Sequence, residues 1–192
     1  MGRYRELKIF ISGGCKNGKS YCAQRLARAQ SKGFLYYIAT MKPVDSEDDK
    51  RIARHKEERE GWGFITVEQP KNIEEILNKC DSSGSFLLDS TTALLANEMF
   101  LPDFSVNEKA DEKIINSFLH ILQKVKNIVI VSDFIYSDAI LYDGLTEKYR
   151  RSLAAIDKRL AKECDVVLEV AYENLIYHKG CEVYNELLET LS

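Results

Sequence analysis

The sequence predicts an α/β fold with three layers, in which helices cover both faces of a mostly parallel sheet. Short apolar runs alternate along the chain with helix-length polar segments, an order typical of strand–helix–strand units. Several of the runs, such as KIFIS and NIVIVS, are apolar at nearly every position. Strands that are covered on both faces have this character.

Seven segments are predicted to be strands, because each is a short apolar run of β-branched or aromatic residues. The runs FLYYIA and DVVLEV show this composition most clearly. The predicted strands are residues 7–12, 34–39, 64–68, 85–89, 128–132, 165–170 and 174–178.

Besides the polar segment 45–60, four helices are predicted between these strands. Residues 19–30 carry Leu26 and small alanines at helical spacing. Residues 72–78 begin with Asn-x-x-Glu, which resembles a capping box formed by Asn72 and Glu75. The segments 109–126 and 146–163 each place apolar side chains on one stripe. These are Ile114, Ile115, Phe118, Leu119 and Leu122 in the first segment, and Tyr149, Leu153, Ile156 and Leu160 in the second.

Length and composition indicate a soluble protein. The 192 residues are expected to form one domain, with 45% hydrophobic and 30% charged residues. We expect no membrane span and no secretory signal, and the net charge of -3 argues against a nucleic-acid partner. The five cysteines form no C-x-x-C pair and the three histidines stand far apart. This pattern predicts free thiols in a cytoplasmic protein and no zinc motif.

The segment GGCKNGKS at residues 13–20 fits the phosphate-loop pattern G-x-x-x-x-G-K-[ST]. Such a loop wraps backbone N–H groups around phosphate oxygens at the N-terminus of a helix. Lys19 is expected to reach the terminal phosphates, and Ser20 to ligate Mg²⁺. The segment follows an apolar run and opens a helical stretch, which favours a nucleotide site over a glycine-rich turn.

The predicted strand 85–89 ends in Asp89. Phosphate-loop enzymes carry a second acid on the Mg²⁺ side at such a strand end. A carboxylate that only caps the strand or the next helix is the alternative. Together with the phosphate loop, the position of Asp89 favours the metal role.

Residues 45–60 (DSEDDKRIARHKEERE) are predicted to be helical but are polar almost all round. A helix without an apolar stripe is either solvated or faces a ligand. Arg51, His55 and Arg59 share one face, and Lys56 stands beside them. Flanking cations lower the pKa of a histidine and leave a neutral imidazole that can attack phosphorus. Taken alone, the segment is better explained as a salt-bridged helix that exposes its histidine.

Five short motifs follow one another in the first half of the chain. They are GGxxxGKS at 13–20, YIAT at 37–40, RIxxHKxxR at 51–59, TxE at 66–68 and LLDxxTxxxxN at 87–97. In this order they resemble the bifunctional adenosylcobinamide kinase / adenosylcobinamide-phosphate guanylyltransferase family of cobalamin assembly. A weaker likeness continues to about residue 180.

The resemblance implies two reactions in one protein. Members of the family phosphorylate the aminopropanol hydroxyl of the corrinoid adenosylcobinamide with a nucleoside triphosphate, ATP or GTP. They then transfer GMP from GTP to that phosphate through a covalent guanylyl-histidine. The resemblance therefore makes His55 the nucleophile and Lys19 a second catalytic residue, with Mg²⁺ held by Ser20 and Asp89. It also implies a cyclic homo-oligomer, a trimer. The implied nucleotide contacts are Gly13, Gly14, Cys15, Lys16, Asn17, Gly18, Lys19, Ser20, Ala39, Thr40, Met41, Lys56, Glu57, Glu58, Arg59, Glu68 and Asp89.

The chain departs from the family pattern at three places. Residues 15–17 are Cys-Lys-Asn where the family usually has Ala-Arg-Ser, although Lys16 keeps a cation. After the fifth strand the family has Asn-Glu-Val-Gly, whereas residues 132–135 are Ser-Asp-Phe-Ile. Asp133 is the candidate to replace the glutamate, and the missing glycine is expected to weaken the kinase step. Residues 181–192 extend beyond the family core and are predicted to form a short helix.

Two other functions stay open at this stage. A diverged paralogue could retain nucleotide binding and one transfer activity, and a non-enzymatic module could use the scaffold to sense nucleotides. A motor that acts on nucleic acid is not favoured, because the sequence shows no basic, aromatic-interleaved stretch.

Overall fold

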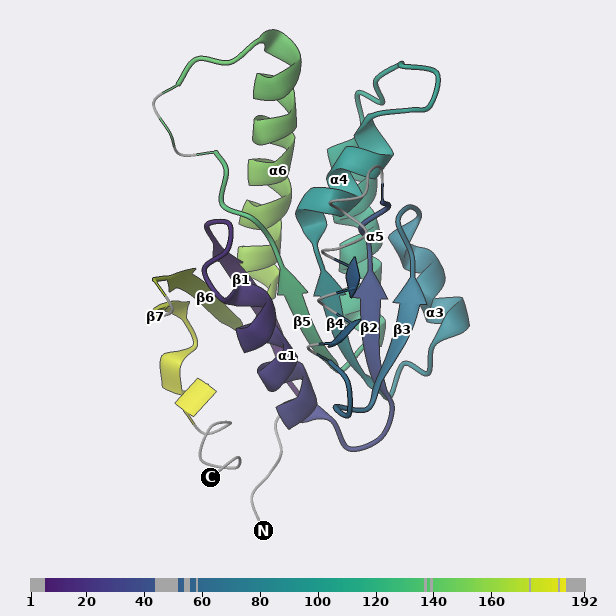
Figure 1. Ribbon diagram of the computed structural model, residues 1–192, viewed down its shortest axis with the longest axis vertical. Coiled ribbons are helices and arrows are strands. Elements are labelled where there is room, and N and C mark those ends of the chain that lie inside the picture. The colour runs from purple at the N-terminus through teal and green to yellow at the C-terminus, as the bar shows by residue number, and fades with distance from the viewer. Residues whose placement is uncertain are drawn as a thin grey trace.

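In the computed structural model, the part of the chain that is described comprises residues 6–43, 52–53, 56–57, 59–136, 138, 140–172, 174–182 and 184–185. Within it, seven strands form one sheet in the order β3-β2-β4-β5-β1-β6-β7 (Figure 1). All pairs are parallel except β6 and β7, which are antiparallel. The strands are β1 Lys8–Gly13, β2 Leu35–Ala39, β3 Phe64–Glu68, β4 Ser85–Asp89, β5 Asn127–Val131, β6 Val166–Ala171 and β7 Asn174–Lys179. Each predicted strand is confirmed.

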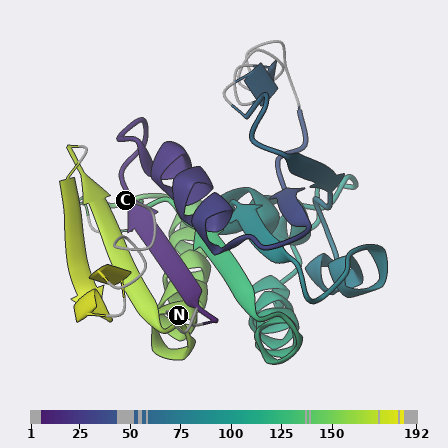
Figure 2. The same ribbon diagram turned by 90° about the horizontal axis from the view of Figure 1, so that it is seen from below.

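Helices cover both faces of this sheet (Figure 2). The helix α1 (Lys19–Gln30) lies on one face, and α4 (Thr91–Met99), α5 (Ala110–Lys124) and α6 (Gly144–Glu163) lie on the other. A 3-10 turn at Ile73–Glu75 and the short helix α3 (Ile76–Lys79) follow β3. The three-layer α/β architecture predicted from the sequence is therefore confirmed.

The central strands are buried on both faces, as their apolar runs predict. In β1, Ile9 and Ile11 pack on the α1 side, whereas Phe10 packs against the core under α4, α5 and α6. Side chains alternate between the two faces of a strand, so a strand in the middle layer must be apolar at every position. The edge strands β3 and β7 are largely exposed, which fits their more polar sequences.

The predicted capping box at Asn72 is wrong. Asn72 has a φ of 48° and its side chain makes no capping bond. Instead its Oδ1 accepts a hydrogen bond from Lys113 Nζ (2.6 Å), and its backbone N–H donates to Glu98 Oε1 (2.6 Å). The polar groups of Asn72 that a capping box would use are therefore bound by residues of α5 and α4. The chain forms a 3-10 turn here in place of a continuous helix.

The helix α4 was not predicted from the sequence. It begins after Ser90, whose hydroxyl accepts a hydrogen bond from the Ala93 N–H (3.4 Å), and it buries Leu94, Leu95 and Met99. Its first residues are two threonines, which have weak helix propensity, whereas residues 93–99 (ALLANEM) are mostly strong helix formers. Packing against the sheet stabilises it, a contribution that local propensity does not reveal.

The C-terminal extension contributes to the core in its described part. Residues 181–182 and 184–185 are helical. Tyr184 is only 3% exposed and packs on the α1 side, with its ring 5.2 Å from that of Tyr177. Residues 186–192 lie outside the described residues.

Within the described chain, no helix has the length and apolar character needed to cross a membrane. The five cysteines are unpaired, as predicted.

Gly13 provides a test of the close approach between β1 and β6. Its φ is +154°, and a Cβ at this position would lie 2.4 Å from the Val170 carbonyl oxygen. We expect Gly13→Ala to lower the free energy of unfolding by about 2–4 kcal/mol, because it adds strain and overpacking at one position. Chemical denaturation measures this change.

Gly33→Ala is the matched control, since a Cβ at Gly33 would meet nothing within 4 Å. It should change the free energy of unfolding by less than about 0.5 kcal/mol. Equal effects of the two substitutions would contradict the close approach at Gly13.

Candidate functional site

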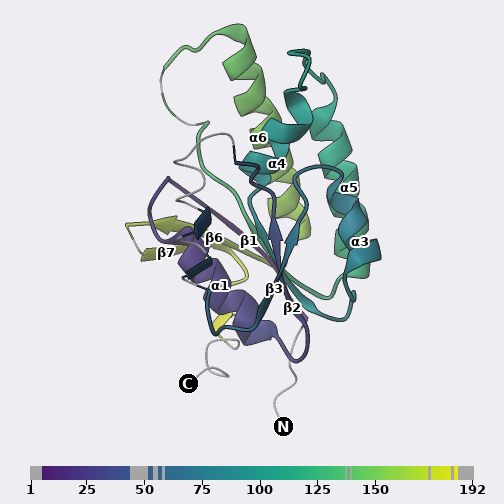
Figure 3. The same cartoon turned by 45° about the vertical axis from the view of Figure 1, so that its right-hand side comes forward.

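The candidate site lies at the carboxyl edge of the parallel sheet. Three features meet there: the loop at residues 13–20 after β1, Asp89 at the end of β4, and Asp133 shortly after β5. The upper ends of α4 and α6 extend beyond this edge (Figure 3). Ligands of open α/β sheets bind outside the carboxyl ends of the strands, so this edge is where a substrate is expected.

The phosphate loop has the backbone shape that its sequence predicts. Lys16 (φ 57°) and Gly18 (φ 88°) adopt left-handed conformations, and α1 begins at Lys19. The Asn17 side-chain amide donates to the Val170 carbonyl oxygen and so fastens the loop to β6. The loop therefore presents backbone N–H groups at the positive end of a helix of 12 residues, an arrangement that favours phosphate.

Lys19 is held across this loop. Its side chain is largely buried, and Nζ donates to the Gly14 carbonyl oxygen (2.7 Å) and pairs with Asp133 Oδ1 (2.9 Å). Asp133 belongs to the passage that departs from the family pattern. The contact with Lys19 places the Asp133 carboxylate at the phosphate loop. Asp133 is the residue that the sequence analysis named as the candidate to replace the family's glutamate.

Asp89 and Arg59 are joined through Tyr37. The Tyr37 hydroxyl donates to Asp89 Oδ2 (3.1 Å), and the Arg59 guanidinium lies 3.5 Å from the centroid of the Tyr37 ring. This stacking is a cation–π contact. Arg59 is only 7% exposed, and its Nη1 has no hydrogen-bond partner among the described residues. A buried guanidinium donor without a partner is costly, so Arg59 is suited to receive an anionic ligand.

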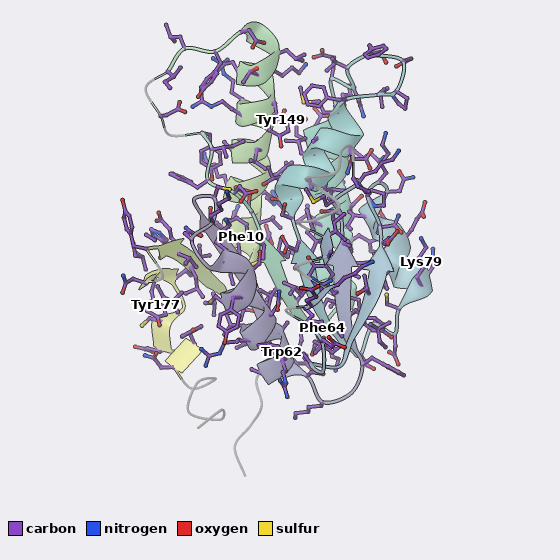
Figure 4. All side chains as sticks on the ribbon, viewed as in Figure 1. Phe10, Trp62, Phe64, Lys79, Tyr149 and Tyr177 are labelled. Atoms are coloured by element: carbon purple, nitrogen blue, oxygen red, sulfur yellow. The ribbon has the colours of Figure 1, made fainter. Side chains whose placement is uncertain are left out.

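A cavity of about 440 Å³ lies between these groups. One wall is formed by small and aromatic side chains of α4 and α6, including Ala93 and Tyr149. Figure 4 shows Tyr149 between α6 and α4, where its hydroxyl donates to the Thr92 carbonyl oxygen (2.8 Å). The charged side chains that line the cavity are Lys56, Arg59, Glu68, Asp89 and Asp133.

Most of the residues that the resemblance assigned to the nucleotide come together here. Ala39, Met41, Lys56, Arg59, Glu68 and Asp89 line the cavity, and the phosphate loop adjoins it through the pair of Lys19 and Asp133. Glu57 is exposed and lines a neighbouring, more open hollow with Phe64. Arg51, His55 and Glu58 lie outside the described residues.

Thr40 has a structural part in the site. It is fully buried, its Oγ1 donates to the Ser90 carbonyl oxygen, and it accepts from the Ser90 N–H, both at 2.7 Å. Asn97 of α4 donates to the Thr40 carbonyl oxygen (2.8 Å). These bonds join the ends of β2 and β4, which hold Ala39 and Asp89 side by side.

Three residues of the site were missed as functional candidates: Tyr37, Tyr149 and Asp157. Tyr37 lies in the apolar run FLYYIA and Tyr149 on the apolar stripe of residues 146–163. Both were therefore interpreted as core residues, and their hydroxyl groups were not considered. Asp157 falls four residues after Leu153 and three before Leu160, on the apolar stripe of α6. A carboxylate at a core position of a helix is the signal that could have indicated it.

Asp157 is a buried carboxylate held by hydroxyl groups. It accepts from Ser132 Oγ (2.7 Å) and the Tyr136 hydroxyl (3.1 Å). Burial raises its pKa to about 7, and the hydrogen bonds with Ser132 and Tyr136 oppose that rise. Burial likewise raises the pKa of the Tyr149 hydroxyl, with the negative charges of Asp133 and Asp157 adding to the effect.

The oxygen ligands present fit Mg²⁺. Asp89 offers a carboxylate that lines the cavity, and Ser20 offers a hydroxyl in the first turn of α1. Mg²⁺ is usually bound by one or two carboxylates together with substrate phosphates, so this set needs no cage made of protein alone. In the described chain no cluster of three or more His, Cys, Asp and Glu residues could hold a metal.

Comparison with known protein families assigns the chain to a family. A family model described as cobinamide kinase / cobinamide phosphate guanyltransferase matches residues 9–172. No match to a curated protein sequence is found.

Solved structures show the same fold at low sequence identity. A KaiC-like protein from Pyrococcus horikoshii OT3 superposes with a TM-score of 0.51 and 14% identity, over 93% of this chain and 81% of that chain. An ATPase from the type III secretion system of pathogenic bacteria has a TM-score of 0.53 and 10% identity, over 97% of this chain and 62% of that chain. These likenesses show a P-loop NTPase fold.

Lys19→Ala tests the phosphate loop. The substitution should raise the Kd for GTP about a hundredfold, because Lys19 offers a charge-assisted hydrogen bond to phosphate that no neighbour replaces. Calorimetry measures the Kd, and circular dichroism should show a folded protein. Lys124→Ala, at an exposed position near the end of α5, should bind GTP as the parent does. A Lys19→Ala variant with parental affinity would contradict the assignment.

Proposed function

This chain belongs to the cobinamide kinase / cobinamide phosphate guanyltransferase family, and from that membership we propose that it phosphorylates adenosylcobinamide and transfers GMP from GTP to the product. The family establishes the general role, a nucleotide-dependent transferase of cobalamin biosynthesis. The proposal adds the substrates and the route, in which a histidine carries GMP between the two reactants.

One observation carries the proposal: the same cavity is lined by a residue that contacts the phosphate loop and by two cations that lie close to His55 in the sequence. Asp133, which contacts Lys19, lines the same cavity as Lys56 and Arg59. Lys56 directly follows His55, and Arg59 comes one helical turn later. A nucleotide with its terminal phosphates on the loop would extend into this cavity, toward the segment that carries the proposed nucleophile.

In the proposed guanylyl transfer, a neutral nitrogen of His55 attacks the α-phosphorus of GTP. The bond from that phosphorus to the bridging oxygen breaks, and pyrophosphate leaves with the electron pair. A phosphate oxygen of adenosylcobinamide phosphate then attacks the same phosphorus, the phosphoramidate bond breaks, and the imidazole is released. Lys56 and Arg59 are suited to stabilise the charge that develops on the phosphoryl oxygens.

In the proposed kinase step, Lys19 binds the phosphoryl group that passes from ATP or GTP to the corrinoid hydroxyl. Asp133 stands beside it, in the position where the family has glutamate. Ser20 and Asp89 are proposed to hold Mg²⁺, which would neutralise phosphate charge and stabilise the leaving group. The remaining implied contacts, at residues 13–18, Ala39–Met41, residues 56–59 and Glu68, are proposed to bind the nucleotide.

A second candidate is a paralogue that retains guanylyl transfer with little kinase activity. The passage after β5 favours it, because Phe134 and Ile135 occupy positions where the family has valine and glycine. Both side chains are more than one-third exposed at the edge of the site, and the Phe134 N–H donates to the Gly13 carbonyl oxygen (2.9 Å). The phosphate loop and this passage are thus in direct contact.

The assembly and location of the protein remain predictions from the family. We propose a homo-oligomer, a trimer, that works in the cytoplasm on a small corrinoid without a nucleic-acid partner. The sensing module stays the alternative from another functional class, and it would bind nucleotide without forming any covalent species.

Separate assays of the two steps test the effect of residues 132–135. With adenosylcobinamide as acceptor, we expect phosphorylation to be slower by about tenfold or more than guanylyl transfer to adenosylcobinamide phosphate, a difference of about 1.4 kcal/mol in barrier. The two rates are measured at saturating nucleotide. Equal rates would show that Asp133 and its neighbours serve the kinase step fully.

The guanylyl-histidine is tested with α-labelled GTP and Mg²⁺. A phosphoramidate is labile in acid and stable in base, so label should be lost after acid treatment and kept after base. His55→Ala should carry no label. The control is His178→Ala, since His178 of β7 pairs with Glu169 at an exposed position, and this variant should be labelled as the parent is. Label that survives acid, or that persists in His55→Ala, would place the nucleophile elsewhere. A protein that binds GTP and is never labelled would favour the sensing module.

A further inference from the structure

Behind the site, a buried carboxylate accepts hydrogen bonds from two segments that are far apart in sequence. Asp157 of α6 is only 2% exposed. Its Oδ2 accepts from Ser132 Oγ (2.7 Å) and from the Tyr136 hydroxyl (3.1 Å), and its Oδ1 lies 3.5 Å from Thr91 Oγ1. Ser132 and Tyr136 follow β5, whereas Thr91 opens α4 after β4. Asp157 thus lies where the two strand ends and α6 meet.

The two segments carry Asp89, a proposed ligand of the metal, and Asp133, which pairs with Lys19 of the phosphate loop. Ser132 immediately precedes Asp133, and Thr91 follows Asp89 by two residues. They are also joined directly, since the Asp133 N–H donates to Thr92 Oγ1 (3.0 Å). Asp133 in turn pairs with Lys19. A path of contacts therefore runs from Asp157 to the phosphate loop.

We propose that Asp157 is a positioning residue, which fixes Asp89 and Asp133 relative to one another so that a Mg²⁺–nucleotide binds between the acids and the phosphate loop. This inference rests on the proposed function and deepens it. Asp157 touches no substrate and acts only through Ser132, Tyr136 and Thr91. The proposal assigns a purpose to a carboxylate that neither reaction uses directly.

The chemistry of the site explains why this position holds a carboxylate. A carboxylate has two accepting oxygens and, when ionised, can receive all three hydroxyl groups, whereas an asparagine side chain has one accepting oxygen and an NH₂ that must donate. Burial raises the pKa of Asp157, and the hydrogen bonds from these hydroxyl groups favour its ionised form. Burying a carboxylate is costly, and an apolar side chain would often serve stability as well or better. The titratable groups around it are Asp133 after β5, Tyr136 in the same passage and Tyr149 on α6. A carboxylate at this position is therefore better explained by its role in orienting the hydroxyl groups of Ser132, Tyr136 and Thr91 than by a contribution to the free energy of unfolding.

The experiment compares Asp157→Asn with Asp165→Asn. Asp165 is the matched control, because it also accepts a hydrogen bond across the sheet, from the Lys8 N–H (2.9 Å), but at the opposite edge. The Kd for GTP is measured with and without Mg²⁺, in the absence of corrinoid. Mg²⁺ is expected to lower the Kd for GTP, and we expect the factor by which it does so to be at least about fivefold smaller in Asp157→Asn than in the parent. The Kd measured without Mg²⁺ should stay within about threefold of the parental value. Asp165→Asn should retain the full Mg²⁺ effect, and Asp89→Asn should lose it.

The outcome that overturns the proposal is a folded Asp157→Asn protein with the parental Mg²⁺ effect. If Asp157→Asn does not fold, Tyr136→Phe and Ser132→Ala each remove one hydroxyl while the carboxylate stays. Either variant should then lose part of the Mg²⁺ effect, and parental behaviour of both would also overturn the proposal. The binding experiment contains no corrinoid, so its outcome does not depend on either transfer reaction. A chain that shows the expected Mg²⁺ pattern but fails to guanylylate adenosylcobinamide phosphate would refute the proposed function and leave the role of Asp157 standing.

Discussion

The parallel register of the sheet determines where every part of the site lies. Hydrogen-bonded pairing aligns Glu68 with Ala39, Ala39 with Asp89, Asp89 with Val131, and Val131 with Ile11. This row crosses five strands at one level, so the chain that follows each residue emerges at the same edge. A shift of one residue in any pair would turn every side chain of the shifted strand to the opposite face. The apolar runs of β1, β4 and β5, buried on both faces, therefore hold the phosphate loop and two acidic residues together.

Charge compensation then stabilises a site that is partly buried. Lys19 pairs with Asp133, and Arg59 lies on the Tyr37 ring whose hydroxyl binds Asp89. A buried charge without a partner is strongly disfavoured, so these two acids near the cavity each have a donor close by. The proposed nucleotide would bring its own negative charge close to Lys19 and Arg59. The same low-dielectric surroundings that penalise a bare charge strengthen the contacts with phosphate.

The sequence predicted the features that depend on local pattern. The seven strands follow from apolar runs, and the phosphate loop follows from glycine and lysine at fixed spacing. Features that depend on distant contacts were beyond it: the polar groups of Asn72 are bound by Lys113 and Glu98 of other helices. Asp157 was missed because its partners come from segments 21 to 66 residues away. Such a network exists only once the sheet has brought β4, β5 and α6 together.

The two proposed reactions make different demands on one cavity. Phosphorylation breaks the bond to the terminal phosphorus, whereas guanylyl transfer breaks the bond at the α-phosphorus, so in the proposed route the corrinoid hydroxyl must reach the terminal phosphorus of a bound nucleotide and His55 must reach its α-phosphorus. The cavity is lined by Asp133, which pairs with Lys19 of the phosphate loop, and by the cations Lys56 and Arg59. The passage after β5 touches the phosphate loop, through Phe134 and Gly13. In the proposed function, changes in that passage would therefore alter phosphorylation, whereas Lys56 and Arg59, the cations proposed to serve guanylyl transfer, lie outside it.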